Sequence, residues 1–355
     1  MQSHTQELAK YWLRKPGRSL ALSRIQLLAE LPPGEQLLAA ILRCDLETFT
    51  SVAVTDGTIC ADRIDQFVRE ASRHQLTNLV LDRIFDLGLV SLMPADSLKK
   101  LTGMALRESA DQQLKDQQFR QLLQLLAEHR DELVWIKGGA LSRTVYEKAT
   151  YRNYGDLDVV VRASAITPVI KALEQFGFAR VDGPAFSSQY GIGPVYPTES
   201  IFLTPVSDWV PTTALSLQRV GWTVLDIKAS PYDRGAQMVE LDRFFVDSQL
   251  QKLQDQPFRS PSVVDSLIIS LYTLQKDRFI SWKTLLDVRL LCAEVARAQL
   301  WDAFTRCARR ESLSVDCWAG LVMAVDRLKA AVPDAVLHEL GQSRSLLSGF
   351  AAFTH

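Results

Sequence analysis

Hydrophobic residues recur at helical spacing through the first part of the chain. Residues 34–49 and 61–90 carry apolar side chains every three or four positions, which predicts amphipathic helices. Residues 96–133 are more polar, and we expect one extended helix there whose glutamines and charged side chains form a solvated face. The pattern predicts an N-terminal helical region over residues 1–130.

The pattern changes to short apolar runs after this region. The expected elements are strands at residues 133–136, 156–161 and 222–230 and helices at residues 140–147 and 164–178. Gly177 is expected to end the second of these helices. Residues 183–220, rich in Gly, Pro, Ser and Thr, are expected to form a long loop with short strands. Strands that alternate with helices predict a compact domain over residues 131–245.

Helical spacing returns towards the C-terminus. Residues 260–279, 281–298 and 300–332 show it, and Ser262 is a suitable N-cap for the first of these helices. We therefore expect a C-terminal helical domain over residues 246–355. The fold class expected for the whole chain is α+β or α/β, with a small mixed-sheet core flanked by N- and C-terminal helical regions.

Composition and charge exclude several classes of protein. The 355 residues carry a formal net charge of −1, so no global field attracts nucleic acid or an anionic membrane, and no extended nucleic-acid surface is indicated. The five cysteines are scattered without a C-x-x-C pair, and no Cys/His spacing suits zinc. Residues 1–19 lack the apolar segment of a signal peptide, and no apolar run reaches transmembrane length. We expect a cytoplasmic protein with no membrane partner.

Two carboxylates stand side by side at the start of the second expected strand. Side chains two apart in a strand share a face, so Asp156 and Asp158 point the same way while Leu157 points into the core. Adjacent carboxylates repel each other, and a divalent cation bound by oxygen ligands, such as Mg²⁺, removes that conflict. The alternative is a solvent-exposed turn before a strand. Asp226, in the third expected strand, is the candidate third ligand; the alternative is an edge-strand aspartate that faces water.

A Lys-Gly-Gly sequence lies between the first expected strand and the helix that follows it. Backbone N–H groups of Gly138 and Gly139 at such a junction favour a phosphate, helped by the helix dipole. Lys137 and Arg152 add positive charge to the same stretch. The alternative is an ordinary tight turn. The glycine turn, the cations and the aspartate pair lie close together in the sequence, and this combination favours a site for phosphate and metal.

These residues belong to a longer pattern. Its members are Lys137-Gly138-Gly139-Ala140-Leu141, Tyr146, Arg152, Gly155 and Asp156-Leu157-Asp158. The pattern resembles the signature of an uncharacterised bacterial nucleotidyltransferase-like family of the DNA polymerase beta nucleotidyltransferase superfamily. Residues 71–85, 223–228 and 266–291 are similar to further parts of that family. The chain departs from it at two positions: Gly139 stands where the superfamily usually has a serine, and Lys228 stands where a histidine often follows the third acid.

The resemblance implies a magnesium-dependent nucleotidyltransferase. Such an enzyme transfers an NMP from an NTP to a hydroxyl acceptor and releases pyrophosphate. The acceptor would be a protein, an RNA end or a small molecule, and ATP is the favoured nucleotide. Asp156, Asp158 and Asp226 would be the catalytic residues and the metal ligands. Asp156 and Asp158 would bridge two Mg²⁺ ions, and Asp226 would complete the site of the catalytic ion and help to draw the acceptor proton.

Nucleotide binding is also implied by the resemblance. The residues concerned are Lys137, Gly138, Gly139, Arg152, Tyr272 and Lys276. The first three would hold the β- and γ-phosphates, and Arg152 would neutralise charge on the leaving pyrophosphate. Tyr272 and Lys276 are four residues apart on one expected helix face and would reach the base and triphosphate; the alternative is a surface lysine beside a packed tyrosine.

Three other hypotheses stay open. One is a nucleotide-binding scaffold without turnover. Another is a toxin-like nucleotidyltransferase of a bacterial toxin–antitoxin system, since such toxins also carry Lys-Gly-Gly before Asp-x-Asp. The third is a helical interaction protein in which the aspartate pair is incidental. The intact set of three acids argues against the scaffold, and the cation-flanked turn argues against the interaction protein.

Overall fold

The structure is a computed structural model that describes residues 31–180, 215–219, 221–232, 241–277 and 279–350. Residues 1–19, where we expect no signal peptide, lie outside the described residues. Of the loop expected over residues 183–220, only residues 215–219 are described. In the ranges that are described, no helix combines the length and the apolar composition needed to cross a membrane.

The chain folds into two compact units, each assembled from separated stretches of sequence. The helical unit consists of Met1–Ala110, Val145–Asn153 and Ser270–His355, and the sheet unit of Asp111–Thr144 and Tyr154–Ile269. The three domain ranges expected from the sequence follow one another along the chain, whereas these two units interleave.

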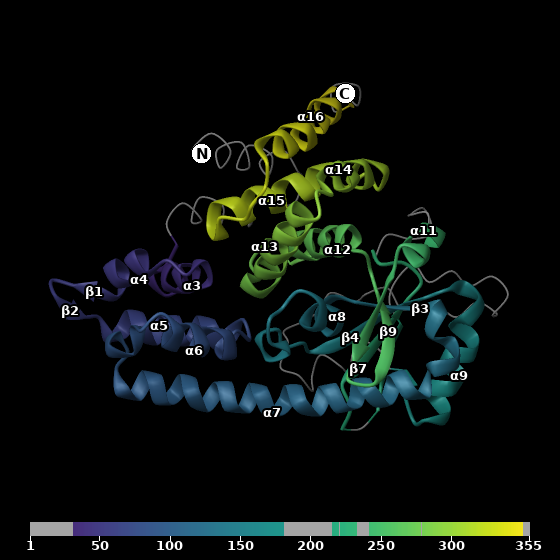
Figure 1. The fold of residues 1–355 in the computed structure, drawn as a ribbon, viewed down its shortest axis with the longest axis horizontal. Coiled ribbons are helices and arrows are strands. Elements are labelled where there is room, and N and C mark those ends of the chain that lie inside the picture. Colours follow the sequence, from purple (N-terminus) through teal and green to yellow (C-terminus); the bar gives the residue numbers. More distant parts are fainter. Residues whose placement is uncertain (1–30, 181–214, 220, 233–240, 278, 351–355) are drawn as a thin grey trace. The chain divides into compact units, whose positions relative to one another are not determined.

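Short helices build most of the helical unit. They are α3 (Pro33–Arg43), α4 (Leu46–Ala53), α5 (Ala61–Arg73), α6 (Thr77–Asp86), α13 (Trp282–Arg297), α14 (Trp301–Arg310), α15 (Ser314–Leu328) and α16 (Asp334–Phe350) (Figure 1). Minor elements are the hairpin β1 (Val54–Thr55) and β2 (Thr58–Ile59) and the 3₁₀ turns η1 (Leu89–Leu92) and η3 (Ala149–Tyr151). The periodic stretch expected at residues 34–49 forms two helices, because left-handed Cys44 ends α3 and the Asp45 side chain caps α4. Fully buried Leu38, Phe67 and Leu321 belong to the core of this unit.

The long helix α7 (Ala95–Leu125) begins in the helical unit and continues into the sheet unit. It is shorter than expected, because the 3₁₀ turn η2 (Ala127–Glu132) leads the chain into the first strand of the main sheet. The expectation of a solvated face is wrong for two of its glutamines, since Gln112 and Gln118 are buried. Hydrogen bonds to Gly221 and Thr223, described below, explain the burial of Gln118, and Gln112 donates to Asp116 one turn later in the same helix.

A five-stranded mixed sheet forms the centre of the sheet unit. The strands, in spatial order, are β3 (Leu133–Ile136), β4 (Asp156–Val161), β7 (Val224–Lys228), β6 (Leu215–Gln218) and β5 (Ala179–Arg180). Strands β4 and β7 are parallel, and the other neighbours are antiparallel. The three strands expected from the sequence are present, and the expected α+β class, a small mixed sheet with helical flanks, is confirmed.

Further elements of the sheet unit complete its core. They are α8 (Lys137–Thr144), η4 (Ala163–Ala165), α9 (Ile166–Gln175), α11 (Leu241–Val246), the hairpin β8 (Gln249–Leu253) and β9 (Gln256–Ser260), and the start of α12 (Val263–Lys276). Two expected boundaries are confirmed: Gly177, with φ of 96°, follows the end of α9, and the Ser262 hydroxyl caps α12 by accepting from the Asp265 N–H. The hairpin lies in a range expected to be helical, yet its Leu253 and Phe258 are buried in the sheet core.

The core side of the sheet is set by alternation along the strands. Leu157 and Val159 of β4 and Leu225 and Ile227 of β7 are all buried in one hydrophobic cluster with Phe119 of α7. Because successive side chains in a strand point to opposite faces, the even-numbered residues of β4 and β7 lie on the other face of the sheet.

Candidate functional site

Three carboxylates meet on that second face. Asp158 on β4 and Asp226 on β7 are direct partners in the parallel ladder, and Asp156 lies two residues before Asp158 on the same face. One carboxylate oxygen from each of the three residues lies within 4.8 Å of the other two. The structure therefore brings together the three acids that the sequence singled out as candidate ligands.

The three carboxylates differ in exposure, and the pKa values of two of them are shifted in opposite directions. Asp156 is exposed, Asp226 is half-buried and Asp158 is buried. Asp156 as a whole residue is exposed, but its carboxyl group lies in the cluster, where loss of solvation, and then repulsion by Asp158 and Asp226, raises its pKa to about 6. Burial on its own would raise the pKa of Asp158, but the attraction of Lys137 and Lys228 outweighs burial and lowers this pKa below its ordinary value.

Two ammonium groups contact the same oxygen of Asp158. Lys137 Nζ donates to Oδ1 at 2.7 Å, and Lys228 Nζ lies 3.2 Å from Oδ1. The Lys228 side chain is 5% exposed and the Lys137 side chain is 25% exposed. Three carboxylates and two ammonium groups leave the cluster with one net negative charge.

The donor set fits a hard divalent cation. Mg²⁺ takes oxygen ligands at about 2.1 Å, so ligands on opposite sides of the ion are roughly 4.2 Å apart. The 4.8 Å bound on the carboxylate oxygens is close to that span, and small side-chain rotations would close the cluster on an ion. A cation would also relieve the repulsion that raises the pKa of Asp156. Asp156, Asp158 and Asp226 are the residues that could hold a metal.

The Lys-Gly-Gly sequence forms the first turn of α8 and does not precede the helix as a separate turn. Lys137 adopts a left-handed backbone with φ of 55°, so the chain leaves β3 and starts the helix at one residue. This conformation costs a non-glycine residue roughly 1–2 kcal/mol, and such strain is concentrated at functional sites. A Cβ atom on Gly139 would lie 2.7 Å from Leu157 Cδ2. Glycine therefore lets α8 pack directly on β4, and a serine at this position would have to displace Leu157.

Gln118 of α7 holds the residues that directly precede β7 in place through hydrogen bonds. Its Oε1 accepts from the Thr223 N–H at 2.9 Å and from the Thr223 hydroxyl at 2.8 Å, and its Nε2 donates to the Gly221 carbonyl at 2.9 Å. Asp226 follows three residues after Thr223. The sequence held no signal for this role, because Gln118 lies among many other polar residues in a long helix.

Asp116 of α7 ties two further segments together. Its carboxylate pairs with Arg143 at the end of α8 and accepts from the Tyr154 hydroxyl at 3.1 Å and from Gln112 Nε2 at 2.9 Å. Lys115 donates to the Tyr154 carbonyl at 2.6 Å. These contacts hold the backbone just before β4, and so they support the position of the two aspartates on that strand.

Comparison with known proteins relates the chain to one family. Residues 61–329 match the model of a family described as an uncharacterised nucleotidyltransferase. The chain belongs to this family. The matched range covers about three quarters of the sequence and includes every candidate site residue, so the resemblance stated from the sequence is confirmed. No curated protein and no solved structure gives a match.

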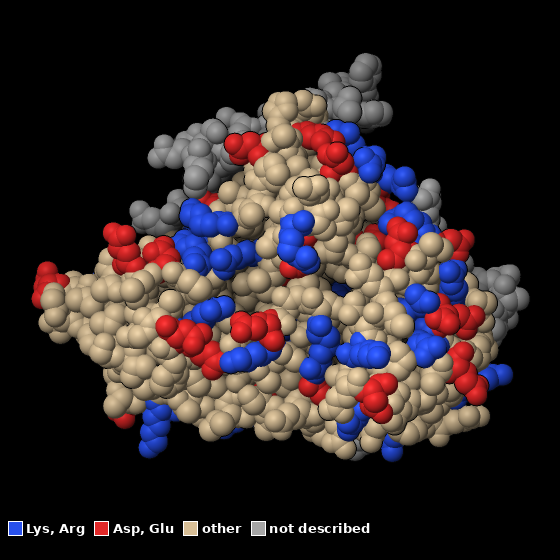
Figure 2. Space-filling model, viewed as in Figure 1, with Lys and Arg blue, Asp and Glu red and all other residues tan. Residues whose placement is uncertain are grey.

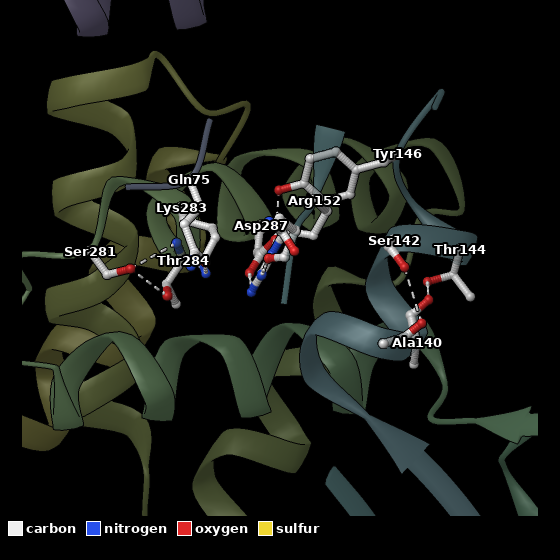
Figure 3. A network of polar contacts seen from close by, with 12 residues as sticks. Gln75, Ala140, Ser142, Thr144, Tyr146, Arg152, Ser281, Lys283, Thr284 and Asp287 are labelled. Carbon is white, nitrogen blue, oxygen red and sulfur yellow. Dashed lines mark hydrogen bonds and ion pairs between the residues drawn. The ribbon is translucent and has the colours of Figure 1, made fainter. Parts of the chain in front are cut away.

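In this member of the nucleotidyltransferase family, Arg152 is part of a buried cluster in the helical unit (Figure 3). Its Nε and Nη2 donate to the two carboxylate oxygens of Asp287, each at 2.8 Å. Its Nη1 donates to the Asn153 carbonyl at 2.7 Å. The Tyr146 hydroxyl donates to Asp287 Oδ1 at 2.6 Å, and burial followed by the Asp287 charge raises the pKa of Tyr146. The cluster joins Val145–Asn153 to α13.

Tyr272 and Lys276 lie on the part of α12 that belongs to the helical unit. Tyr272 is half-buried and Lys276 is exposed. Their spacing places them on one side of the helix. A role in binding the base or the triphosphate stays a prediction for both.

The raised pKa of Asp156 predicts a pH dependence of stability in the metal-free protein. Its carboxyl group binds a proton with a pKa of about 6 in the folded chain, against an ordinary value of 3.8. The folded state therefore binds more protons than the unfolded state between about pH 4 and 6, and this group's contribution to the free energy of unfolding falls as the pH rises through that window.

Urea unfolding in EDTA, from pH 4 to pH 7, measures this contribution as the difference between wild type and Asp156→Asn. The stability of wild type relative to the variant should fall as the pH rises and then level off above about pH 6. A difference that stays constant over the whole range would contradict the prediction.

Proposed function

We propose that this protein is a metal-dependent nucleotidyltransferase, which transfers an NMP from an NTP to a hydroxyl acceptor and releases pyrophosphate. The proposal rests on the meeting of Asp156, Asp158 and Asp226 on one face of the sheet, with Lys137 at the start of α8 in contact with Asp158. Carboxylates that suit a cation, beside a positively charged helix N-terminus, suit a polyphosphate bound with a divalent ion. Membership of the family supports the same activity.

The three carboxylates would bind Mg²⁺, and the family resemblance implies two ions. A bound ion would neutralise phosphate charge and make the acceptor hydroxyl easier to deprotonate. Asp226, which is half-buried, would take the proton of that hydroxyl. The acceptor oxygen would form a bond to the α-phosphorus, and the bond from this phosphorus to the bridging oxygen would break, so that pyrophosphate leaves.

Lys137 and the backbone N–H groups of Gly138 and Gly139 would bind the β- and γ-phosphates. They stand at the positive end of the α8 dipole. The Lys137 ammonium is the more exposed of the two that contact Asp158, so it can turn to a phosphate when a metal ion takes over the charge of that carboxylate. A role for Arg152 at the pyrophosphate is also proposed from the resemblance, but its contacts with Asp287 favour a structural role.

ATP is the proposed nucleotide, with Tyr272 and Lys276 as candidate contacts to it. A protein, an RNA end or a small molecule would supply the hydroxyl group. Lys and Arg side chains are intermixed with Asp and Glu over the face shown in Figure 2, which gives no support there for a long basic track along a nucleic acid. We expect no membrane partner and a cytoplasmic location.

Label transfer tests the proposed reaction. The full-length protein is incubated with Mg²⁺, cell extract and each of the four NTPs, labelled either at the α- or at the γ-phosphorus. NMP transfer moves the α-label into an acceptor and releases the γ-label as pyrophosphate, whereas phosphoryl transfer would move the γ-label. The fraction that carries the α-label, whether protein, RNA or small molecule, identifies the class of acceptor.

Two alternatives give different results in the same experiment. A scaffold without turnover would bind NTP but transfer neither label. A toxin-like member of a toxin–antitoxin system would use the same chemistry, and its expression alone would arrest growth of the host cell. Failure of every NTP to move the α-label, in the presence of Mg²⁺ and extract, would contradict the proposed function.

Lys137→Ala is expected to weaken NTP binding while leaving the fold intact. A charge-assisted contact to phosphate contributes about 1.5–3 kcal/mol, so the affinity should fall roughly ten- to hundredfold. Titration of the Mg²⁺-loaded protein with NTP, followed by calorimetry, measures the change. Lys171→Ala is the matched control, because Lys171 is an exposed lysine on α9. Equal NTP affinity in wild type and Lys137→Ala would remove Lys137 from the phosphate site.

A further inference from the structure

Lys228 is a buried lysine inside the carboxylate cluster. It lies two residues after Asp226 on β7, so both side chains stand on the same face of the sheet. Its ammonium group reaches across to the neighbouring strand β4 and lies 3.2 Å from Asp158 Oδ1. Both side chains are nearly inaccessible to solvent, at 5% and 2% exposure. An ion pair buried to this degree is costly to break, because either partner alone would be left as an uncompensated charge.

Lys137 contacts the same oxygen, but its side chain is more exposed to solvent than that of Lys228. The exposed fraction is five times as large, and the Lys137 backbone is held in the left-handed conformation at the start of α8. Because the Lys137 ammonium group is partly open to solvent, it can exchange its carboxylate partner for water or phosphate at a lower cost than the Lys228 ammonium group can. Of the two cations on Asp158, Lys137 is therefore the exchangeable one and Lys228 is the fixed one.

The position of the fixed cation limits what Asp158 can bind. A carboxylate that bridges two metal ions gives one oxygen to each ion. If Lys228 keeps Oδ1, a metal ion at Oδ1 would stand within contact distance of a positive charge, and Asp158 is left with Oδ2 as its metal ligand. The charge of the cluster also argues against a second metal ion. The cluster has one net negative charge, and a single divalent ion already makes its total charge positive.

We propose that Lys228 is a built-in cation that takes the place of a second metal ion at Asp158. The protein on its own would then hold one divalent ion, through Asp156, Asp226 and Oδ2 of Asp158. A second ion would join only together with the negative charge of a triphosphate. This inference rests on the metal site of the proposed function, and it assigns Lys228 a positioning role that sets how many ions the site holds.

Mn²⁺ titration of the full-length protein without nucleotide tests the proposal. Free Mn²⁺ is counted by its electron paramagnetic resonance signal, which is lost on binding, so the readout does not depend on activity. Wild type should bind one Mn²⁺ per chain at this cluster, and Lys228→Arg, which keeps the charge, should also bind one. Lys228→Met should bind a second ion or bind the first one about tenfold more tightly, because a positive charge roughly 5 Å from a divalent ion has been removed.

Controls keep the test decisive. Lys171→Met changes the net charge of the protein equally but at an exposed lysine on α9, and it should bind Mn²⁺ as wild type does. Lys228→Gln serves if Lys228→Met does not fold, and circular dichroism checks both variants. The number of Mn²⁺ ions bound per wild-type chain tests the proposal even if no Lys228 variant folds.

Three results would overturn the proposal. Two Mn²⁺ ions bound to wild type without nucleotide would remove the role of Lys228 and leave the proposed function standing. The same holds if Lys228→Met or Lys228→Gln binds Mn²⁺ in the same number and with the same affinity as wild type. No Mn²⁺ bound to wild type, with or without NTP, would remove the metal site and with it both the proposed function and this inference.

Discussion

Asp156→Asn is expected to raise the melting temperature of the metal-free protein and, at the same time, to reduce NMP transfer by about 10³-fold or more. The two effects have one cause. The carboxylate of Asp156 loses solvation and is repelled by Asp158 and Asp226, so its charge opposes folding at neutral pH. The same charge would hold the metal ion, whose contribution of several kcal/mol to the transition state corresponds to this loss of rate.

Differential scanning fluorimetry in EDTA and α-label transfer in Mg²⁺ measure the two effects. Asp242→Asn is the matched control, because Asp242 is a nearly fully exposed aspartate paired with Arg162, and it should change neither quantity appreciably. A lower melting temperature for Asp156→Asn would contradict the electrostatic argument, and retained transfer would contradict the metal site.

Asp287→Ala is expected to lower the free energy of unfolding by about 3–5 kcal/mol, because it leaves the Arg152 guanidinium buried without its carboxylate. Urea unfolding at pH 7 measures this loss. Asp302→Asn is the control: Asp302 is exposed on α14 of the same unit, and its replacement should change stability by less than about 0.5 kcal/mol. The double variant Arg152→Met/Asp287→Leu should recover much of the loss, since apolar side chains of similar volume need no partner.

The same variants separate the two roles considered for Arg152. If Arg152 is structural, Arg152→Ala and Asp287→Ala should lower transfer only as far as each lowers the folded fraction. If Arg152 acts on the leaving pyrophosphate, Arg152→Ala should reduce transfer per folded molecule, while Asp287→Ala leaves it unchanged. A loss of less than about 1 kcal/mol in Asp287→Ala would contradict the buried ion pair.

The sequence predicted the parts of the site that depend on short-range geometry. Alternation along a strand puts Asp156 and Asp158 on one face, and the same rule applied to β7 puts Asp226 on the more polar one. The register of β4 against β7 pairs Asp158 with Asp226. This register is set by the fold and cannot be deduced from either strand alone. Asp226 was the candidate third ligand from its place on the more polar face of β7, and the resemblance to a family agreed with this choice.

Contacts between distant parts of the chain could not be predicted in this way. Gln118 looked like one polar residue among many in α7, and only its bonds to Gly221 and Thr223 explain its burial. Arg152 looked like a phosphate ligand, and its partner Asp287 lies far away in sequence. Lys228 departs from the family pattern in the sequence, but its contact with Asp158 depends on the register of two strands.

The prediction missed the hairpin at residues 249–260 for a different reason. Its strands are short and its pattern of exposure is irregular, so no clear two-residue alternation marks it in the sequence. Burial of Leu253 and Phe258 against the sheet core stabilises it, and that is a tertiary effect.

Because the helical unit is made from three stretches of chain and the sheet unit from two, neither can be cut out as one continuous piece. During synthesis from the N-terminus, the whole sheet unit leaves the ribosome before the last stretch of the helical unit, Ser270–His355, has been translated. The N-terminal helices must therefore wait for α13–α16, with apolar surface open to chaperones in the meantime. A single recombination point at any boundary between these stretches would divide the helical unit, so the helical unit cannot be exchanged between genes by one crossover.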